Sequence, residues 1–304
     1  MMLAAHSRIT IPPETWFLLT LVQRLPISRV LTAEEQNLAV TLITNHYRWP
    51  DMRISSGDFR RLAAVLPEPR VRDLMEVIYG IHLQLAGKIR WGDKTPHYIK
   101  IIPELANIFP GSRFICLVRD GRDVVKSMQK MHWYGPWFHD NTIEWVEAAR
   151  HERRWVASGY DDQILRVRYE DLVTETETTL HRTCEFLGEQ YEPQMLSWQN
   201  NVDELIPQRE RHVHQKLTRA TTRSDIERWK TEMTSREIFL TEAFIYRDLR
   251  RYGYACRFGS RVWIPIFWLA RVYCRSSKAL WEGMRLLYRG ARFVIRRVVR
   301  GLTA

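Results

Sequence analysis

The sequence predicts an α/β fold in which helices flank a parallel sheet. Three observations support this prediction. The run Phe114–Val118 is apolar, partly β-branched and short, as in a strand buried within a parallel sheet. Strand-like stretches alternate along the chain with stretches whose apolar residues recur at helical spacing. The chain has 304 residues, 45% of them hydrophobic, which is enough for one large domain with a sizeable core.

The individual elements follow from local signals. Thr32-Ala-Glu-Glu35 is a capping box, which predicts a helix reaching about Tyr47. A second helix is predicted from about Glu68 to Ala86, where Gly87 ends it, and a short strand follows over 88–91. The remaining predicted elements are helices over about 98–108, 123–131, 142–157, 174–187 and 235–251, and strands over 114–118 and 164–169.

The most informative stretch runs from Arg113 to Met128, where the predicted strand leads through a polar turn into a helix. The carboxyl end of a strand that feeds a helix is where α/β proteins bind phosphates. Arg119 can form a bidentate contact with a phosphate, and the Ser127 hydroxyl can reach the same ligand from within the helix. Taken alone, the stretch fits a surface turn with an Arg–Asp pair equally well.

A second segment upstream, Trp91-Gly-Asp-Lys-Thr-Pro-His97, favours the phosphate-binding interpretation over the surface turn. Together the two segments resemble the sulfotransferase superfamily that uses 3′-phosphoadenosine-5′-phosphosulfate (PAPS), in its bacterial and tyrosylprotein branches. The resemblance implies that Arg119 and Ser127 bind the 3′-phosphate of the donor. It also implies that Lys94 steadies the charge on the sulfuryl and bridging oxygens during transfer. A surface lysine paired with Asp93 is the plainer alternative for Lys94.

Three further segments are similar to this family. Ile9-Thr-Ile-Pro-Pro-Glu-Thr-Trp16 resembles the element that carries the general base, which places Glu14 in that role; a turn cap is the alternative. Ile164-Leu-Arg-Val-Arg-Tyr-Glu-Asp-Leu172 resembles a later core strand, whose tyrosine, here Tyr169, lies near the donor phosphates. Relatives close a loop over the donor where this chain has the basic stretch 209–223, so Lys216, Arg219 and Arg223 are candidate donor ligands. A solvated basic loop explains them as well.

One part of the family pattern is missing. The family implies a P-loop-NTPase-like sheet, whose central first strand leads into a Gly-x-x-Arg-Ser-Gly-Thr-Thr loop that wraps the 5′-phosphosulfate. This sequence contains no such loop. We therefore expect a sheet in which the central strand is missing or replaced, and whose neighbouring strands need other partners. Three explanations for the missing strand and loop stay open: a start further upstream, a remnant enzyme, or a gap closed by other residues.

The sequence argues against a disulfide-bonded protein, a metalloprotein, a secreted protein and a membrane-spanning protein. The four cysteines, Cys116, Cys184, Cys256 and Cys274, have no paired spacing, and Cys116 and Cys184 fit small core residues. No His, Cys and carboxylate cluster predicts a metal site. The sequence shows neither a signal-peptide pattern nor an apolar stretch long enough for a membrane span. We expect a cytoplasmic protein.

The last part of the chain carries most of the net charge of +11. Residues 257–304 contain eleven Lys and Arg and a single acid, Glu282, which leaves the body nearly neutral. From Leu280 the apolar residues follow helical spacing. We therefore divide the chain into a sulfotransferase-like α/β domain over 1–256 and a basic amphipathic helical tail over 257–304. Such a tail, with its Trp and Tyr, suits an anionic membrane surface such as the inner face of the membrane. Nucleic acid is the second choice of partner.

These observations favour a PAPS-dependent sulfotransferase that acts on a hydroxyl or amine. The acceptor class stays open among small molecules, lipid-linked compounds, carbohydrates and peptides. Two other interpretations are retained. The chain could be a catalytically degenerate binding protein of the same fold, or a membrane-surface protein that acts through its basic tail.

Overall fold

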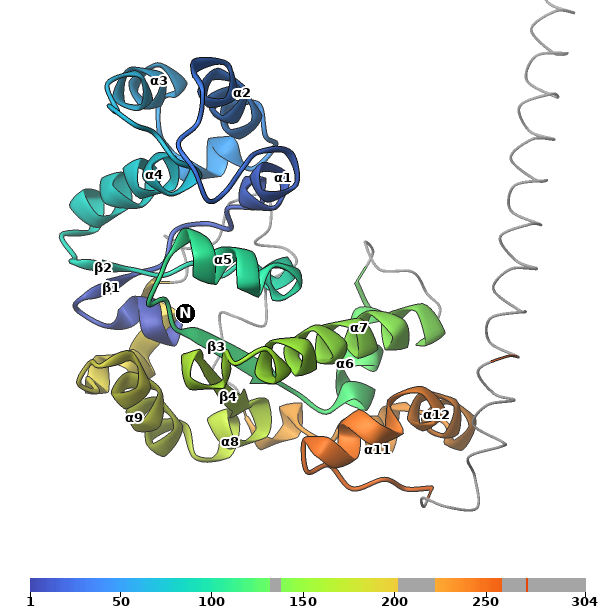
Figure 1. Ribbon diagram of the computed structural model, residues 1–304. Helices are drawn as coiled ribbons and strands as arrows, with labels where there is room; N and C mark the ends of the chain where they lie inside the picture. Colours follow the sequence, from blue (N-terminus) through green and yellow to red (C-terminus); the bar gives the residue numbers. More distant parts are fainter. Residues whose placement is uncertain (132–137, 202–221, 259–271, 273–304) are drawn as a thin grey trace, which may run out of the picture. The chain divides into compact units, whose positions relative to one another are not determined.

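The computed structural model describes residues 1–131, 138–201, 222–258 and 272 (Figure 1). The chain divides into two compact units. Unit 1 comprises Met1–Arg119 and Ala148–Ile226, and unit 2 comprises Asp120–Glu147 and Glu227–Ala304. The predicted donor-loop residues Lys216 and Arg219 lie outside the described residues, as does nearly all of the predicted tail 257–304.

Unit 1 is rich in helices and contains short parallel strands. Its helices are α1 (Phe17–Arg24), α2 (Ala33–Thr44), α3 (Ser56–Ala64), α4 (Val71–Ala86), α5 (Ile102–Ile108), α8 (Tyr169–Thr174) and α9 (Thr176–Leu187). The helix α7 (Phe138–Ala157) crosses the boundary between the units. The strands are β1 (Ile9–Thr10), β2 (Arg90–Trp91), β3 (Phe114–Val118) and β4 (Ile164–Arg168). Short 3-10 segments occupy Met2–Ala5, Trp49–Met52, Pro96–Lys100, Asp161–Gln163, Pro193–Asn201 and Arg223–Asp225.

Within the described residues the strands pair in parallel in two separate ladders, whereas the sequence predicts one sheet whose central strand is missing or replaced. Ile9 and Thr10 of β1 lie opposite Arg90 and Trp91 of β2, and β3 pairs with β4 along its full length. Strand β3 is only partly buried, with Leu117 55% exposed, so the prediction of a fully buried strand is wrong. Within the described residues β4 is its only ladder partner. A strand with one partner lacks the cover on both sides that an apolar run usually indicates.

The main hydrophobic core of unit 1 lies among α1 to α5. Helix α1 packs against α2, α2 against α3, and α3 against α4 (Figure 1). The capping box of Thr32 and Glu35 starts α2 as predicted, and Gly87, at φ 61°, ends α4. Fully buried members of this core are Phe17, Leu21, Ile43, Phe59, Leu74 and Ile78.

Tyr169 differs from its predicted place at the end of a strand. Strand β4 ends at Arg168, and Tyr169 is the first residue of α8. The acidic residues Glu170 and Asp171 follow in the first turn of that helix, where the helix dipole favours negative charge.

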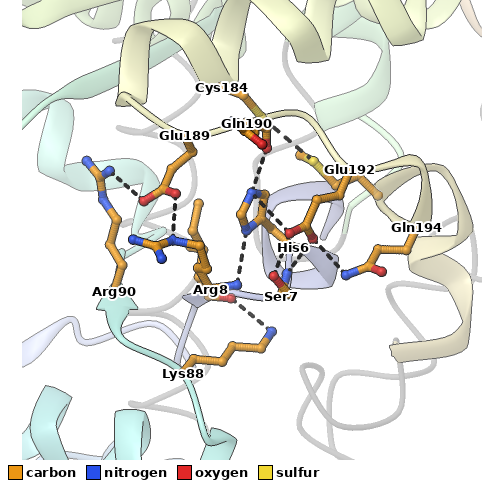
Figure 2. A network of polar contacts seen from close by, with 12 residues as sticks. His6, Ser7, Arg8, Lys88, Arg90, Cys184, Glu189, Gln190, Glu192 and Gln194 are labelled. Atoms are coloured by element: carbon orange, nitrogen blue, oxygen red, sulfur yellow. Dashed lines mark hydrogen bonds and ion pairs between the residues drawn. The ribbon is translucent and has the colours of Figure 1, made fainter.

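A polar network fastens the N-terminal segment to the loop after α9 (Figure 2). His6 Nε2 donates to the carbonyl of Gln190 at 2.8 Å, while its Nδ1 accepts from the backbone N–H of Arg8 at 3.1 Å. Glu189 accepts from Arg8 at 2.9 Å and from Arg90 at 3.0 Å, so its carboxylate bridges the starts of β1 and β2. Both His6 and the Glu189 side chain are almost fully buried.

Unit 2 contains α6 (Gly121–Met128), the first half of α7, α11 (Trp229–Glu232) and α12 (Ser235–Arg251). Helix α6 starts two residues earlier than predicted, because Asp120 caps it by accepting the backbone N–H of Arg122. Gly121 allows close packing, since a Cβ there would lie 3.0 Å from the ring of Trp145 and 2.7 Å from Ile245.

The guanidinium of Arg122 lies at the centre of unit 2, inside a buried ion cluster. It donates to both oxygens of Asp120, to Glu242 at 2.6 Å and to the carbonyl of Ala255 at 2.8 Å. It also lies 3.7 Å from the centre of the Trp229 ring. No helix in the described part of the chain is long and apolar enough to cross a membrane.

Candidate functional site

Glu14 and Lys94 meet beyond the carboxyl ends of two paired strands. Glu14 follows β1 by four residues, and Lys94 follows β2 by three. Because β1 and β2 are parallel and in register from Ile9 and Arg90, the two loops leave the ladder on the same side. Lys94 Nζ forms an ion pair with Glu14 Oε1. Sequence reasoning assigned these two residues to one reaction centre, and the structure brings their side chains together.

The second oxygen of Glu14 has two more polar neighbours. Trp16 Nε1 donates to Glu14 Oε2 at 2.7 Å, and an Arg48 nitrogen lies 3.4 Å from the same oxygen. Burial alone would raise the pKa of Glu14, but the charges of Lys94 and Arg48 and the hydrogen bonds from Lys94 and Trp16 outweigh it, so the pKa is lowered. Glu14 is therefore ionised at neutral pH. The plainer alternative pairs Lys94 with Asp93, and the ion pair that the structure shows joins Lys94 to Glu14.

A polar network lies on the buried side of the Glu14–Lys94 ion pair. The half-buried carboxylate of Asp93 accepts hydrogen bonds from the Thr15 hydroxyl, from Tyr79 at 2.8 Å and from Thr95 at 2.9 Å. Burial raises the pKa of Asp93, the three hydroxyl donors oppose this, and the nearby charge of Glu14 adds to the rise. Sequence reasoning missed this network, although Thr15 and Asp93 are the sequence neighbours of Glu14 and Lys94.

Aromatic rings border the pair. The ring of Trp16 lies against the ring of His97, with 4.3 Å between centroids and an interplanar angle of 44°. Both residues are half-buried, and they come from the same two loops as Glu14 and Lys94. An acceptor that approaches Glu14 would therefore meet aromatic surface next to the carboxylate.

Arg119 and Tyr169 form a second group of predicted site residues. Arg119 directly follows β3 and Tyr169 directly follows β4, its parallel partner. The Arg119 guanidinium lies 4.6 Å from the centre of the Tyr169 ring, and it donates to the carbonyl of Asp225 at 2.6 Å. The carboxyl ends of the β3–β4 ladder thus hold a cation over an aromatic ring, an arrangement suited to a phosphate or a nucleotide.

Ser127 lies on α6 and is half-buried. It belongs to unit 2 and Arg119 to unit 1, so their convergence on one phosphate stays a prediction. No group of three or more potential metal ligands occurs in the described part of the chain. Burial raises the pKa of the Cys116 thiol to about 11, which suits an inert core residue, and Cys184 is fully buried.

The chain is similar to known sulfotransferases. The sulfotransferase family model matches residues 1–193. A putative protein-tyrosine sulfotransferase of Caenorhabditis briggsae is 30% identical over 108 residues, which are 34% of this chain and 39% of that protein. A 3-alpha-hydroxysteroid sulfotransferase of Cavia porcellus is 26% identical over 123 residues, 34% of this chain and 42% of that protein. These matches span about two fifths of the curated relatives.

Solved structures show the same fold. The sulfotransferase domain from the curacin biosynthetic pathway has a TM-score of 0.56 and 20% identity, covering 84% of this chain and 92% of that one. The sulfotransferase domain of the Synechococcus PCC 7002 olefin synthase has a TM-score of 0.53 and covers 81% and 88%. Since the family model extends over more than half of the sequence, the chain belongs to the sulfotransferase family.

Proposed function

We propose that the chain transfers a sulfuryl group from PAPS to an acceptor hydroxyl or amine, with Glu14 as the general base and Lys94 as the electrophilic partner. The observation that supports this most strongly is the Glu14–Lys94 ion pair beyond β1 and β2, in a chain of the sulfotransferase family. A carboxylate and an ammonium side by side can supply the two things that sulfuryl transfer needs, a proton acceptor and a cation.

In the reaction, Glu14 takes the proton of the acceptor as the acceptor oxygen or nitrogen forms its bond to sulfur. The bond between sulfur and the bridging oxygen breaks, and its electron pair stays on the phosphate of 3′-phosphoadenosine-5′-phosphate (PAP). Lys94, whose side chain is 67% exposed, is free to turn from Glu14 to the bridging oxygen. Since Lys94 lowers the pKa of Glu14, its departure leaves the carboxylate a stronger base.

The donor would be held by Arg119 and Ser127 at its 3′-phosphate, with Tyr169 beside it. Arg119 already lies over the Tyr169 ring, which supports their action as one group. Lys216 and Arg219 would close over the donor. One charge-assisted contact of this kind contributes about 1.5–3 kcal/mol to donor binding.

The acceptor of this chain is proposed by class. The relatives are named for protein tyrosine and for a 3-alpha-hydroxysteroid, both of which carry a hydroxyl group. A hydroxyl on a small molecule, a lipid-linked compound, a carbohydrate or a peptide would suit Glu14 as base.

The test is Glu14→Gln, assayed for sulfuryl transfer from PAPS to a panel of phenols, alcohols and tyrosine peptides. We expect turnover to fall by about 10²–10⁴-fold while binding of PAP is retained. Glu76→Gln is the matched control, because Glu76 forms an exposed ion pair with Arg72 on α4. Unchanged turnover in Glu14→Gln would refute the assignment of the base.

The second candidate is a catalytically degenerate binding protein of the same fold, which would lack the family's Gly-x-x-Arg-Ser-Gly-Thr-Thr loop. A thermal-shift titration with PAP separates the two, because a ligand of the native state raises the melting temperature. Binding without turnover supports the degenerate protein, and the absence of binding contradicts both. An in-frame segment with that loop in the upstream genomic DNA would instead favour the enzyme.

A membrane-surface role of residues 257–304 is the third candidate, supported by their charge and helical apolar spacing. Sedimentation with anionic vesicles at graded salt tests it. The full chain should pellet at low salt and lose binding as salt screens the charges. Equal pelleting of a chain that ends at Phe258 would contradict this role.

A further inference from the structure

The loops that carry Glu14 and Lys94 are joined by bonds that involve neither of those two side chains. The Thr15 hydroxyl donates to the Asp93 carboxylate. The backbone N–H of Thr15 donates to Thr95 Oγ1 at 3.1 Å, and that same hydroxyl donates to Asp93 Oδ1 at 2.9 Å. These bonds form a junction between the two loops. Glu14 and Lys94 lie on its surface side, and their sequence neighbours Thr15, Asp93 and Thr95 form its inner side.

Apart from the half-buried Asp93, the inner side of this junction is buried. Thr15 has no exposed surface, and Thr95 is 5% exposed. The buried Tyr79 hydroxyl donates to Asp93, and the buried Tyr98 hydroxyl donates to the carbonyl of Thr15 at 2.5 Å. A buried polar network in which the acceptors are satisfied fixes local geometry, because every alternative arrangement leaves a buried group unpaired.

The ion pair itself is less able to fix this geometry. The Lys94 side chain is mostly exposed, and exposed ion pairs contribute about 0–1 kcal/mol. In the proposed reaction Lys94 also leaves Glu14 for the donor, so the pair breaks when the position of the base matters most. Trp16 and Arg48 still contact the Glu14 side chain at that moment, but the loop that carries Glu14 needs other bonds to keep its place.

We propose that Thr15 and Asp93 are positioning residues that clasp the Glu14 loop to the Lys94 loop, so that Glu14 keeps its place when Lys94 turns to the donor. This inference rests on the proposed roles of Glu14 and Lys94. Thr15 is fully buried and cannot touch substrate, so its effect reaches the reaction only through the position of Glu14.

The kinetic test compares Thr15→Val, Thr15→Ser and Asp93→Asn. We expect kcat to fall by about 10- to 100-fold in Thr15→Val and Asp93→Asn, with PAP affinity unchanged, because a small displacement of a reacting group has an effect of that size. Thr15→Ser keeps the hydroxyl and should recover most of the activity. Thr183→Val is the matched control, since Thr183 is a buried threonine whose hydroxyl bonds only to the backbone carbonyl of Thr179 in α9.

Full kcat in Thr15→Val would overturn the proposal. So would an equal loss in Thr183→Val, because the effect would then be one of general stability. Failure of Thr15→Ser to recover activity would also contradict it, since the hydroxyl would not be the active feature.

A second measurement does not depend on catalysis. Hydrogen exchange of the peptides that contain Thr15 and Thr95 should be faster in Thr15→Val and Asp93→Asn than in the wild type, with peptides of α9 unchanged. If the wild type transfers no sulfuryl group, the proposed function fails while exchange still tests the clasp. Unchanged exchange in both variants overturns the clasp even if the wild type is an active enzyme.

Discussion

Replacing Arg122 with methionine should strongly destabilise unit 2. The Arg122 side chain is 2% exposed, and its two carboxylate partners, Asp120 and Glu242, are 6% and 0% exposed. Methionine preserves much of the volume but removes five contacts: three hydrogen bonds to Asp120 and Glu242, one to the carbonyl of Ala255, and the stacking over Trp229. Two buried carboxylates then lose the guanidinium with which both of them pair.

The expected loss is about 3–5 kcal/mol, which is the effect of removing one partner from a buried ion pair. With a urea m-value of about 3 kcal/mol/M for a chain of this size, the unfolding midpoint should fall by about 1–1.7 M. The assay is urea unfolding followed by circular dichroism. The backbone N–H groups of Arg257 and Phe258 also donate to Glu242, which reduces the loss in free energy of unfolding.

Two further variants make this test decisive. Arg72→Met removes an exposed pair with Glu76 and should change stability by less than about 0.5 kcal/mol. Arg122→Met combined with Glu242→Gln removes one of the stranded charges and should recover part of the loss. If Arg122→Met unfolds at the same urea concentration as Arg72→Met, the buried cluster does not support unit 2.

Three other perturbations have predictable outcomes. Trp16→Phe removes a hydrogen bond to the Glu14 carboxylate and therefore raises the pKa of Glu14. The acidic limb of the pH–activity profile should move to higher pH by about one unit, which corresponds to a bond of about 1.5 kcal/mol. Trp49→Phe loses a comparable indole bond to Ser56 and should leave the pH profile unmoved. Arg119→Met should weaken PAP binding by about 10- to 100-fold in calorimetry, and an unchanged affinity would contradict the donor site. Thr234→Ala removes the capping box of α12 and should lower the free energy of unfolding by about 1 kcal/mol in urea titrations.

Local signals in the sequence predicted much of the secondary structure. The box at Thr32 and Glu35, the stop at Gly87 and the strand Phe114–Val118 are all present. Helix α3 went unpredicted, although Ser55 caps it by accepting from Asp58. The division of the described strands into two ladders could not be predicted from sequence, since strand pairing depends on partners far along the chain.

The candidate site was predictable in part. Resemblance to a family identified Glu14 and Lys94, which the structure joins, and Arg119 and Tyr169, which it also joins. Thr15 and Asp93 could not be recognised from sequence as part of the site, because a threonine after Glu14 and an aspartate before Lys94 look like ordinary loop residues. Only the fold shows that their side chains meet behind the pair.

The fastening of His6 to Gln190 has a consequence for the order of events during synthesis. The two residues are separated by 184 positions, and the contacts of Ser7 with Glu192 and of Arg8 with Glu189 span similar distances. At about 5–20 residues per second, a ribosome needs roughly 10 to 40 seconds to produce the second half of this contact. The nascent N-terminal segment, with the loop that bears Glu14, therefore waits without its final partner until α9 and the turn beyond it have emerged.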